Sequence, residues 1–156
     1  MAPVKRADPY GAYNFEISVI GVAADGKAVS GSFTEASGLE VAMDPIEYRN
    51  GSEDITVRKI PGLKKFTNIT LKKGISGDLE FWQWIVKGMN GTVQRVEGSI
   101  TLLNEAKDPV MQWKFKRGWP CKFTGPGLNA KNNEIAIETV EICHEGLAVD
   151  GDGQQG

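Results

Sequence analysis

Apolar and polar residues alternate along most of this chain, and that pattern predicts a protein built mainly from β-strands. In the segment 13–19 apolar side chains recur at every second position, which is typical of a strand buried on one face. The residues 118–120, which include a proline, predict a break between two later strands. The other segments with strand character are 31–34, 39–43, 66–73, 96–104, 110–117, 121–123 and 133–145.

Two of these segments show which face they bury. In 66–73, Ile69 and Leu71 point one way, while Thr70 and Lys72 point the other. In the segment 110–117 the predicted core face consists of Met111, Trp113 and Phe115.

The last predicted strand has an irregular pattern. Ile135 and Ile137 share one face, but Val140 and Ile142 fall on the other. Either a β-bulge near Thr139 or burial of the strand on both faces would account for this switch.

A single helix is predicted at 78–88, with Ser76 or Asp78 as its N-cap and with Gly88, Asn90 and Gly91 at its end. Its apolar residues cover more than one face, so we expect the helix to pack on its own sheet and to be covered by a neighbouring subunit as well. One face carries Leu79, Trp82, Val86 and Met89, and the wider stripe adds Phe81, Trp84 and Ile85.

A long polar hairpin is predicted between the strands at 39–43 and 66–73. The segments 47–49 and 54–59 flank Asn50 and Gly51, a dipeptide that tolerates the positive φ values of a tight hairpin turn. The arm has few apolar residues and many charges, so burial of its own side chains hardly offsets the entropy lost on ordering. We therefore expect the arm, at about 44–61, to need a partner.

Length and composition restrict the class of protein. The chain has 156 residues, 40% of them hydrophobic and 24% charged, which is ordinary for one globular domain. We expect a single domain at 1–150, with an N-terminal arm at 1–12 and a disordered tail at 151–156. A net charge of −2 argues against nonspecific binding to nucleic acids or membranes, because both require a basic surface.

Charge is nevertheless distributed unevenly. Between positions 45 and 75 there are seven Lys and Arg residues against three Asp and Glu residues, whereas 132–150 holds five acidic residues and no Lys or Arg. These segments are either two solvated faces or surfaces through which one copy meets another.

Catalytic and metal-binding groups are scarce. His144 is the only histidine, so we expect a structural role for it rather than catalysis. Cys121 and Cys143 lack metal-ligand spacing, and we expect two small buried thiols rather than a disulfide. The sequence predicts no enzyme, no cofactor and no metal.

The order of the motifs resembles the tail tube protein family of T4-type contractile phages and phage-tail-like extracellular contractile injection systems. The resemblance extends from Pro9 to Gly146. It is carried by PYGAYNFEISVIG, GSFTEASGLE, EYRNGSED, KIPGLKKFTNITLKKG, SGDLEFWQWI and GWPCKFTGPGLNAKNNEIAIETVEICHEGL.

This resemblance implies a mainly β (α+β) fold, an antiparallel β-sandwich or barrel with one flanking helix and the extended hairpin arm. It implies homohexameric rings that stack into a hollow inner tube, which a contracting sheath drives through a target envelope. The implied partners are the sheath, baseplate and terminator proteins, with an effector or DNA as cargo in the lumen. No membrane insertion by the free subunit is expected.

Within such a tube we expect the hairpin arm and the N-terminal segment to reach the adjacent ring. The residues expected at the ring-stacking interface are Glu47, Tyr48, Arg49, Glu53, Asp54, Arg58 and Lys59. The residues expected to form charge pairs between subunits are Lys64, Lys65, Glu138 and Glu141.

Two other functions stay open at this point. A monomeric β-sandwich that binds carbohydrate or an effector would need a cleft near Trp113 or Trp119, and a type VI secretion-like tube protein would be a more distant relative in fold. With no apolar N-terminal signal in the sequence, we expect synthesis and assembly in the cytoplasm. The final location would be a phage tail or an extracellular injection particle.

Overall fold

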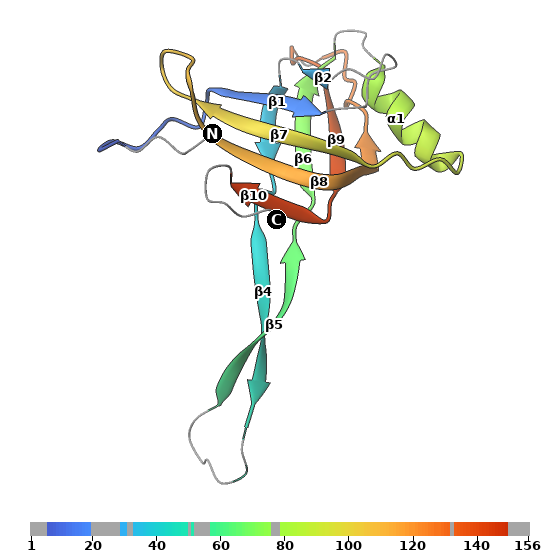
Figure 1. The fold of residues 1–156 in the computed structure, drawn as a ribbon. Coiled ribbons are helices and arrows are strands. Elements are labelled where there is room, and N and C mark those ends of the chain that lie inside the picture. The colour runs from blue at the N-terminus through green and yellow to red at the C-terminus, as the bar shows by residue number, and fades with distance from the viewer. Residues whose placement is uncertain are drawn as a thin grey trace.

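Most of the predicted strands join one large antiparallel sheet, and a two-stranded arm projects from it (Figure 1). The computed structural model describes residues 6–19, 29–30, 33–49, 51, 57–75, 79–131 and 133–149. The elements are β1 (Phe15–Val19), β2 (Val29–Ser30), β3 (Phe33–Ser37), β4 (Val41–Tyr48), β5 (Arg58–Phe66), β6 (Ile69–Gly74), α1 (Glu80–Met89), β7 (Val96–Leu103), β8 (Pro109–Thr124), β9 (Ile137–Cys143) and β10 (Gly146–Val149).

The predicted mainly β fold with one flanking helix is confirmed for the described residues. Strand order in the large sheet is β2-β1-β7-β8-β9-β6-β3, with β10 also paired to β8, and β4 and β5 form the separate arm. All of these pairings are antiparallel. Among the described residues no helix has both the length and the apolar character that crossing a membrane requires.

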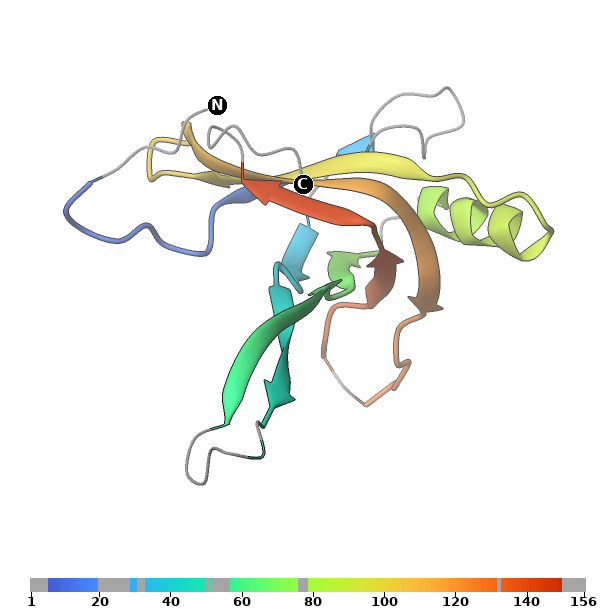
Figure 2. The ribbon, with the colours of Figure 1, turned by 60° about the horizontal axis from the view of Figure 1, so that its bottom comes forward.

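The predicted break at 118–120 is wrong, because β8 continues through these residues. Its first half pairs with β7 and β10, and its second half pairs with β9. At the change of partner, Arg117 has a φ of 53° and the strand bends sharply (Figure 2). A Cβ atom on Gly118 would lie 2.6 Å from Cε2 of Phe115, so glycine lets the bend close onto the core.

The core lies inside the curve of the sheet and under the helix. Phe115 is 3% exposed and lies between Gly98 and Gly118, where any Cβ would meet its ring. Burial of each such side chain stabilises the fold by about 1.5–3 kcal/mol relative to its exposure. The other members of the core are Ile17, Val19, Ile69, Leu71, Phe81, Trp84, Val96, Ile100, Val140 and Ile142.

Helix α1 packs on the sheet through a narrower face than its composition suggests. Phe81 and Trp84 are buried, and Trp84 donates its indole N–H to the carbonyl oxygen of Gln94 at 3.2 Å. Leu79, Trp82 and Met89 are 58%, 47% and 68% exposed. The chain itself therefore covers only part of the apolar stripe, and cover from a neighbouring subunit stays a prediction. The predicted N-caps lie outside the described residues.

The irregular pattern of the last strand has a different cause from a bulge. Strands β6 and β9 pair without any shift from Ile137 to Ile142, so of the two explanations the bulge near Thr139 is wrong. The second face of β9 is half-buried at Thr139, Glu141 and Cys143, which agrees in part with burial on both faces. Glu138 takes an inward position beside Val140 and Ile142, while Ile137 is 37% exposed. A charged residue on the core face, rather than a register change, breaks the apolar alternation. The sequence pattern also missed β10.

Candidate assembly surfaces

The arm formed by β4 and β5 stands clear of the sheet (Figure 1). Within the described residues these strands pair only with each other. The apolar side chains of the arm are exposed, and Leu63 has 81% of its surface accessible. A two-stranded hairpin that packs against nothing else is at best marginally stable in water. The exposed apolar surface of the arm therefore indicates a site for a partner. The other exposed apolar residues of the arm are Val41, Met43, Ile46, Tyr48, Val57 and Ile60.

The middle of the arm has features that hinder uncontrolled pairing with other strands. Pro45 lies opposite Pro61, and neither has a backbone N–H to donate to an added strand. Next to this pair the register shifts between Met43 and Pro45, and a Cβ on Gly62 would lie 2.4 Å from the carbonyl oxygen of Asp44. The ribbon therefore twists at this point, as Figure 1 shows.

Five of the seven residues predicted for ring stacking lie together at the far half of the arm. Glu47 is opposite Lys59, Tyr48 is opposite Arg58, and Arg49 follows Tyr48 along the chain. The remaining two, Glu53 and Asp54, lie outside the described residues. Their role in stacking stays a prediction.

The residues predicted to form charge pairs between subunits have these places in the chain. Lys65 binds Asp44 across the arm, with Nζ 2.7 Å from Oδ2, and Lys64 lies opposite Met43. On β9, Glu138 pairs with a lysine of β6, and Glu141 accepts a hydrogen bond of 2.8 Å from the side-chain amide of Asn68. Pairing between subunits stays a prediction, and Glu138 would have to leave a buried partner to take part.

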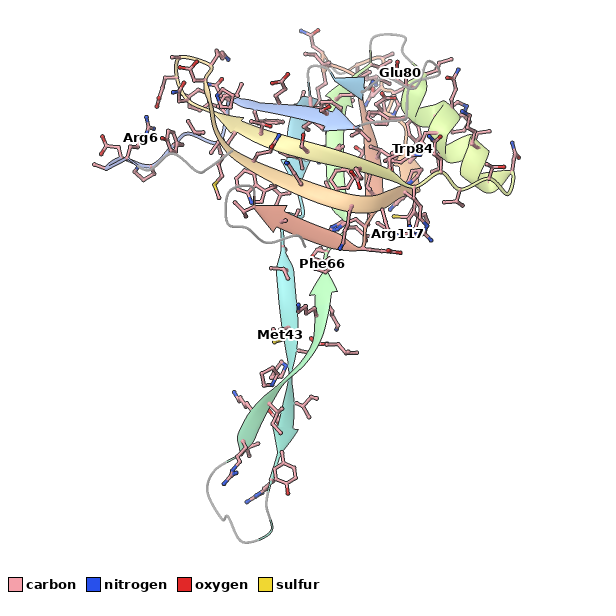
Figure 3. The ribbon with its side chains drawn as sticks, viewed as in Figure 1. Arg6, Met43, Phe66, Glu80, Trp84 and Arg117 are labelled. Atoms are coloured by element: carbon pink, nitrogen blue, oxygen red, sulfur yellow. The ribbon has the colours of Figure 1, made fainter. Side chains whose placement is uncertain are left out.

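His144 holds the foot of the arm. Its Nε2 lies 2.9 Å from the carbonyl oxygen of Thr67, which follows β5, and its Nδ1 lies 3.1 Å from that of Gly146 on β10. The ring also packs against Phe66 and Phe115, with centroids 5.7 and 6.0 Å away. These contacts are structural, because they connect the arm to β10 and to the core (Figure 3 labels Phe66).

The N-terminal segment is fastened to the β7–β8 turn. Two guanidinium nitrogens of Arg6 lie 2.9 Å from the two carboxylate oxygens of Glu105, a bidentate pair. This hydrogen bond to Arg6 is the main reason why the pKa of Glu105 is lowered and that of Arg6 is raised. Arg6 also lies over the ring of Tyr10 at 3.9 Å. Figure 3 shows Arg6 on a segment that extends to the side of the sheet.

The sheet does not close on itself between β1 and β3. Among the described strands, β3 pairs only with β6, and β1 pairs with β2 over just two positions. A cavity of about 240 Å³ lies in the gap, with Trp113 in its wall. The other lining residues are Ala12, Phe15, Thr34, Glu35, Ala36, Leu39, Ile100 and Leu102. Such open edges are sites where another chain can pair.

The structure brings no three potential metal ligands from His, Cys, Asp and Glu together within its described residues. Cys121 and Cys143 are free, as predicted, but they are half-buried rather than fully buried.

Sequence reasoning missed two features of these surfaces. Arg6 and Glu105 are 99 positions apart, and no local pattern connects them. The exposure of Trp82 depends on how far the helix turns its face to the sheet. The binding-module alternative named a cleft near Trp113, but the cavity found there combines residues from several strands that the sequence does not bring together.

Comparison with known proteins identifies relatives of this arrangement. Residues 11–148 match the family model described as T4-like virus tail tube protein gp19. A search of curated proteins found no significant match.

Solved structures include three informative neighbours. The chain is 31% identical to one in the PVC sheath-tube complex of an extracellular contractile injection system, with a TM-score of 0.78, covering 90% of each chain. For a chain of the PVC sheath/tube terminator, identity is 30% and the TM-score 0.79, with 92% of this chain and 97% of that chain covered. A type six secretion system protein is 14% identical with a TM-score of 0.57 over 88% and 83% of the two chains, which shows a shared fold alone.

Proposed function

Because the chain belongs to the T4-like virus tail tube protein gp19 family, and is a tube subunit of a contractile injection system, we propose that six copies form a ring and that the rings stack into a hollow tube. The observation that carries this proposal is the arm of β4 and β5, whose apolar side chains lie exposed within the part of the chain that the structure describes. Identical copies cover these side chains.

Ring formation is supported by the open edges of the sheet. An edge strand presents unpaired N–H and C=O groups, and a closed ring of heterologous contacts removes such edges from every copy. Among the described strands the edges are β2, β3 and β10, and β1 is also open on one side beyond its two positions paired with β2. The cavity has residues of both β1 and β3 in its wall, and in this proposal a neighbouring copy closes the sheet beside it.

Ring stacking uses the arm and the N-terminal segment. The far half of the arm presents Glu47, Tyr48, Arg49, Arg58 and Lys59, with Glu53 and Asp54 between its strands in the sequence. These residues include both acidic and basic side chains. Identical copies can therefore form ion pairs with each other, because each copy supplies both the positive and the negative group. The bidentate pair with Glu105 holds Arg6 at the β7–β8 turn, and this determines where the N-terminal segment lies on the body.

The tube is passive in this proposal. A sheath surrounds it, terminator and baseplate proteins bound its ends, and sheath contraction drives it through a target envelope with an effector or DNA in its bore. Similarity to chains of a PVC sheath-tube complex and of a sheath/tube terminator supports the sheath and the terminator as partners. The subunit has no enzymatic activity of its own. It is made and assembled in the cytoplasm and ends in a phage tail or an extracellular particle.

The test is electron microscopy of purified protein with two matched double variants. Tyr48→Asp with Ile60→Asp places charges on the exposed apolar residues of the arm, whereas Leu128→Asp with Ile135→Asp places the same charges on exposed residues elsewhere. We expect rings without stacked tubes for the first variant and tubes for the second. Equal tube formation by both variants contradicts the role of the arm, and a monomer of wild-type protein at every concentration contradicts assembly altogether.

A further inference from the structure

The two free thiols of this chain lie on neighbouring strands. Strands β8 and β9 pair with Trp119 opposite Cys143 and Pro120 opposite Ile142, and the register then shifts so that Lys122 lies opposite Glu141. Cys121 is the extra residue at this shift, which makes it the inserted residue of a β-bulge.

The bulge places Cys121 on the same face of the sheet as Cys143. Ile142 is buried in the core, whereas Cys143 and Glu141 point to the opposite, half-buried face. In a bulge, two residues of one strand oppose a single residue of its partner, so Cys121 joins Lys122 in facing Glu141. The contact of 3.4 Å from Sγ of Cys121 to the carbonyl oxygen of Glu141 agrees with this placement.

Both sulfur atoms interact in this arrangement. Burial, and after it a hydrogen bond with the Cys143 thiol, raises the pKa of Cys121 to about 12. The side-chain amide of Asn68 lies 3.7 Å from the same sulfur. At neutral pH, Cys121 is therefore held as a thiol, next to a second thiol.

We propose that Cys121 and Cys143 form a redox site, which low-molecular-weight disulfides such as oxidised glutathione convert into a disulfide between β8 and β9. The Cys143 thiolate attacks one sulfur of the reagent, forms a mixed disulfide and releases one thiolate. The Cys121 sulfur, after giving its proton to solvent, attacks the Cys143 sulfur and releases the second thiolate. The protein loses two hydrogen atoms, and the reagent is reduced to two thiols.

The order of these steps follows from the surroundings of Cys121. Only a thiolate attacks a disulfide, and the raised pKa of Cys121 leaves very little thiolate near neutral pH. Cys143 therefore reacts first, and Cys121 resolves the mixed disulfide. The second step needs no encounter through solution, because the two side chains share one face of the sheet, and this proximity offsets the small thiolate fraction of Cys121.

The disulfide would hold β8 to β9 at the bulge, close to the point where β8 changes its pairing partner from β7 to β9. It would also close the segment 122–142 into a covalent loop, which restricts the unfolded chain. We expect the melting temperature to rise by on the order of 5 °C. If the proposed location is right, the thiols stay reduced during assembly and become oxidised when the particle leaves the cell. The chemistry of the pair itself does not depend on that location.

Mass spectrometry of the full-length protein incubated with oxidised glutathione tests the proposal. We expect wild-type protein to lose the mass of two hydrogens, and digestion to release one peptide pair that joins Cys121 to Cys143. Dithiothreitol should restore the original mass and the original melting temperature. A wild-type protein that stays reduced, that keeps glutathione on either cysteine, or that links two copies instead overturns the proposal.

Two single variants test the order of attack. Cys121→Ser keeps Cys143 as the attacking thiol but removes the resolving one, so glutathione should accumulate on Cys143. Cys143→Ser should remain largely unmodified under the same conditions, with at least a tenfold lower rate of adduct formation. Faster modification of Cys121 than of Cys143 overturns the assigned order. Circular dichroism of both variants shows whether they keep the wild-type fold, and a folded Cys121→Ser protein without any adduct also counts against the site.

Discussion

Lys73 and Glu138 form an ion pair inside the protein, with Nζ 3.4 Å from Oε1 and both side chains only 10% exposed. They face each other across β6 and β9, and the ammonium group also lies 4.8 Å from the centre of the Phe81 ring on α1. The pair therefore joins three elements under the helix. Two charges taken out of water are stable here only as long as both are present.

Removal of one partner of this pair should destabilise the protein strongly. For Glu138→Leu we expect a loss of about 3–5 kcal/mol in the free energy of unfolding, because the buried Lys73 charge loses the carboxylate that balances it. Lys73→Met with Glu138→Leu should lose clearly less than the single variant. Urea unfolding followed by circular dichroism measures both, and a double variant less stable than the single one would contradict this account.

Crowding around Phe115 gives a second prediction. Gly98→Ala would place a Cβ 2.5 Å from Cζ of Phe115, so we expect a loss of about 1–3 kcal/mol from overpacking. Phe115→Leu shortens the side chain that clashes. The loss in Gly98→Ala with Phe115→Leu should therefore be smaller than the sum of the two single losses, as a double-mutant cycle of thermal unfolding would measure.

His144 should be needed for the position of the arm rather than for any chemistry. His144→Phe keeps a ring between Phe66 and Phe115 but removes the contacts with the carbonyl oxygens of Thr67 and Gly146. A typical hydrogen bond contributes about 0.5–1.5 kcal/mol, and we expect a loss of that size. Hydrogen exchange at residues 64–70 should become faster. Unchanged exchange there would show that the ring contacts alone hold the arm.

The N-terminal segment should be released by acid. The pKa of Glu105 is lowered mainly by its hydrogen bond with Arg6, so this contact stabilises the attached segment above the ordinary pKa of a glutamate and is lost as the pH falls through the lowered value. The protection factors of residues 6–14, which correct exchange rates for their intrinsic dependence on pH, should fall at low pH and in Arg6→Gln at neutral pH. Lys131→Gln, an exposed position without this contact, is the control. Equal protection of residues 6–14 in Arg6→Gln and wild type would contradict the prediction.

Charge pairing between copies is tested by reversing two lysines of the arm. Lys64→Glu with Lys65→Glu should shorten the tubes and lower their yield in electron micrographs, if these lysines meet acidic residues of another copy. Each exposed pair contributes only about 0.2–1 kcal/mol, so both are changed at once. Lys116→Glu with Lys131→Glu makes the same change in net charge at exposed positions outside the arm. Unchanged tube length and yield in the arm variant would rule out this pairing.

The sequence by itself determined most of the local elements and the family. Period-two alternation located the segment around Ile69 and Leu71, and the apolar helix ended within a residue of its predicted boundary, because both patterns arise from neighbours along the chain. The order of motifs was enough to indicate the tail tube family, which the match over residues 11–148 confirms. The polar arm was also visible as a segment that its own apolar residues could not hold in place.

Only the tertiary structure decided which distant residues meet. Glu138 can occupy a core position and interrupt the apolar pattern because it forms an ion pair with Lys73 on the neighbouring strand. Strand β8 continues through Pro120 because Gly118 allows it to bend over Phe115. Arg6 with Glu105 depends likewise on how the strands are ordered and aligned. Periodicity reports the direction of a side chain along its own strand, whereas its partner is set by register and topology. A shift of one residue in that register would exchange every contact without altering the local pattern.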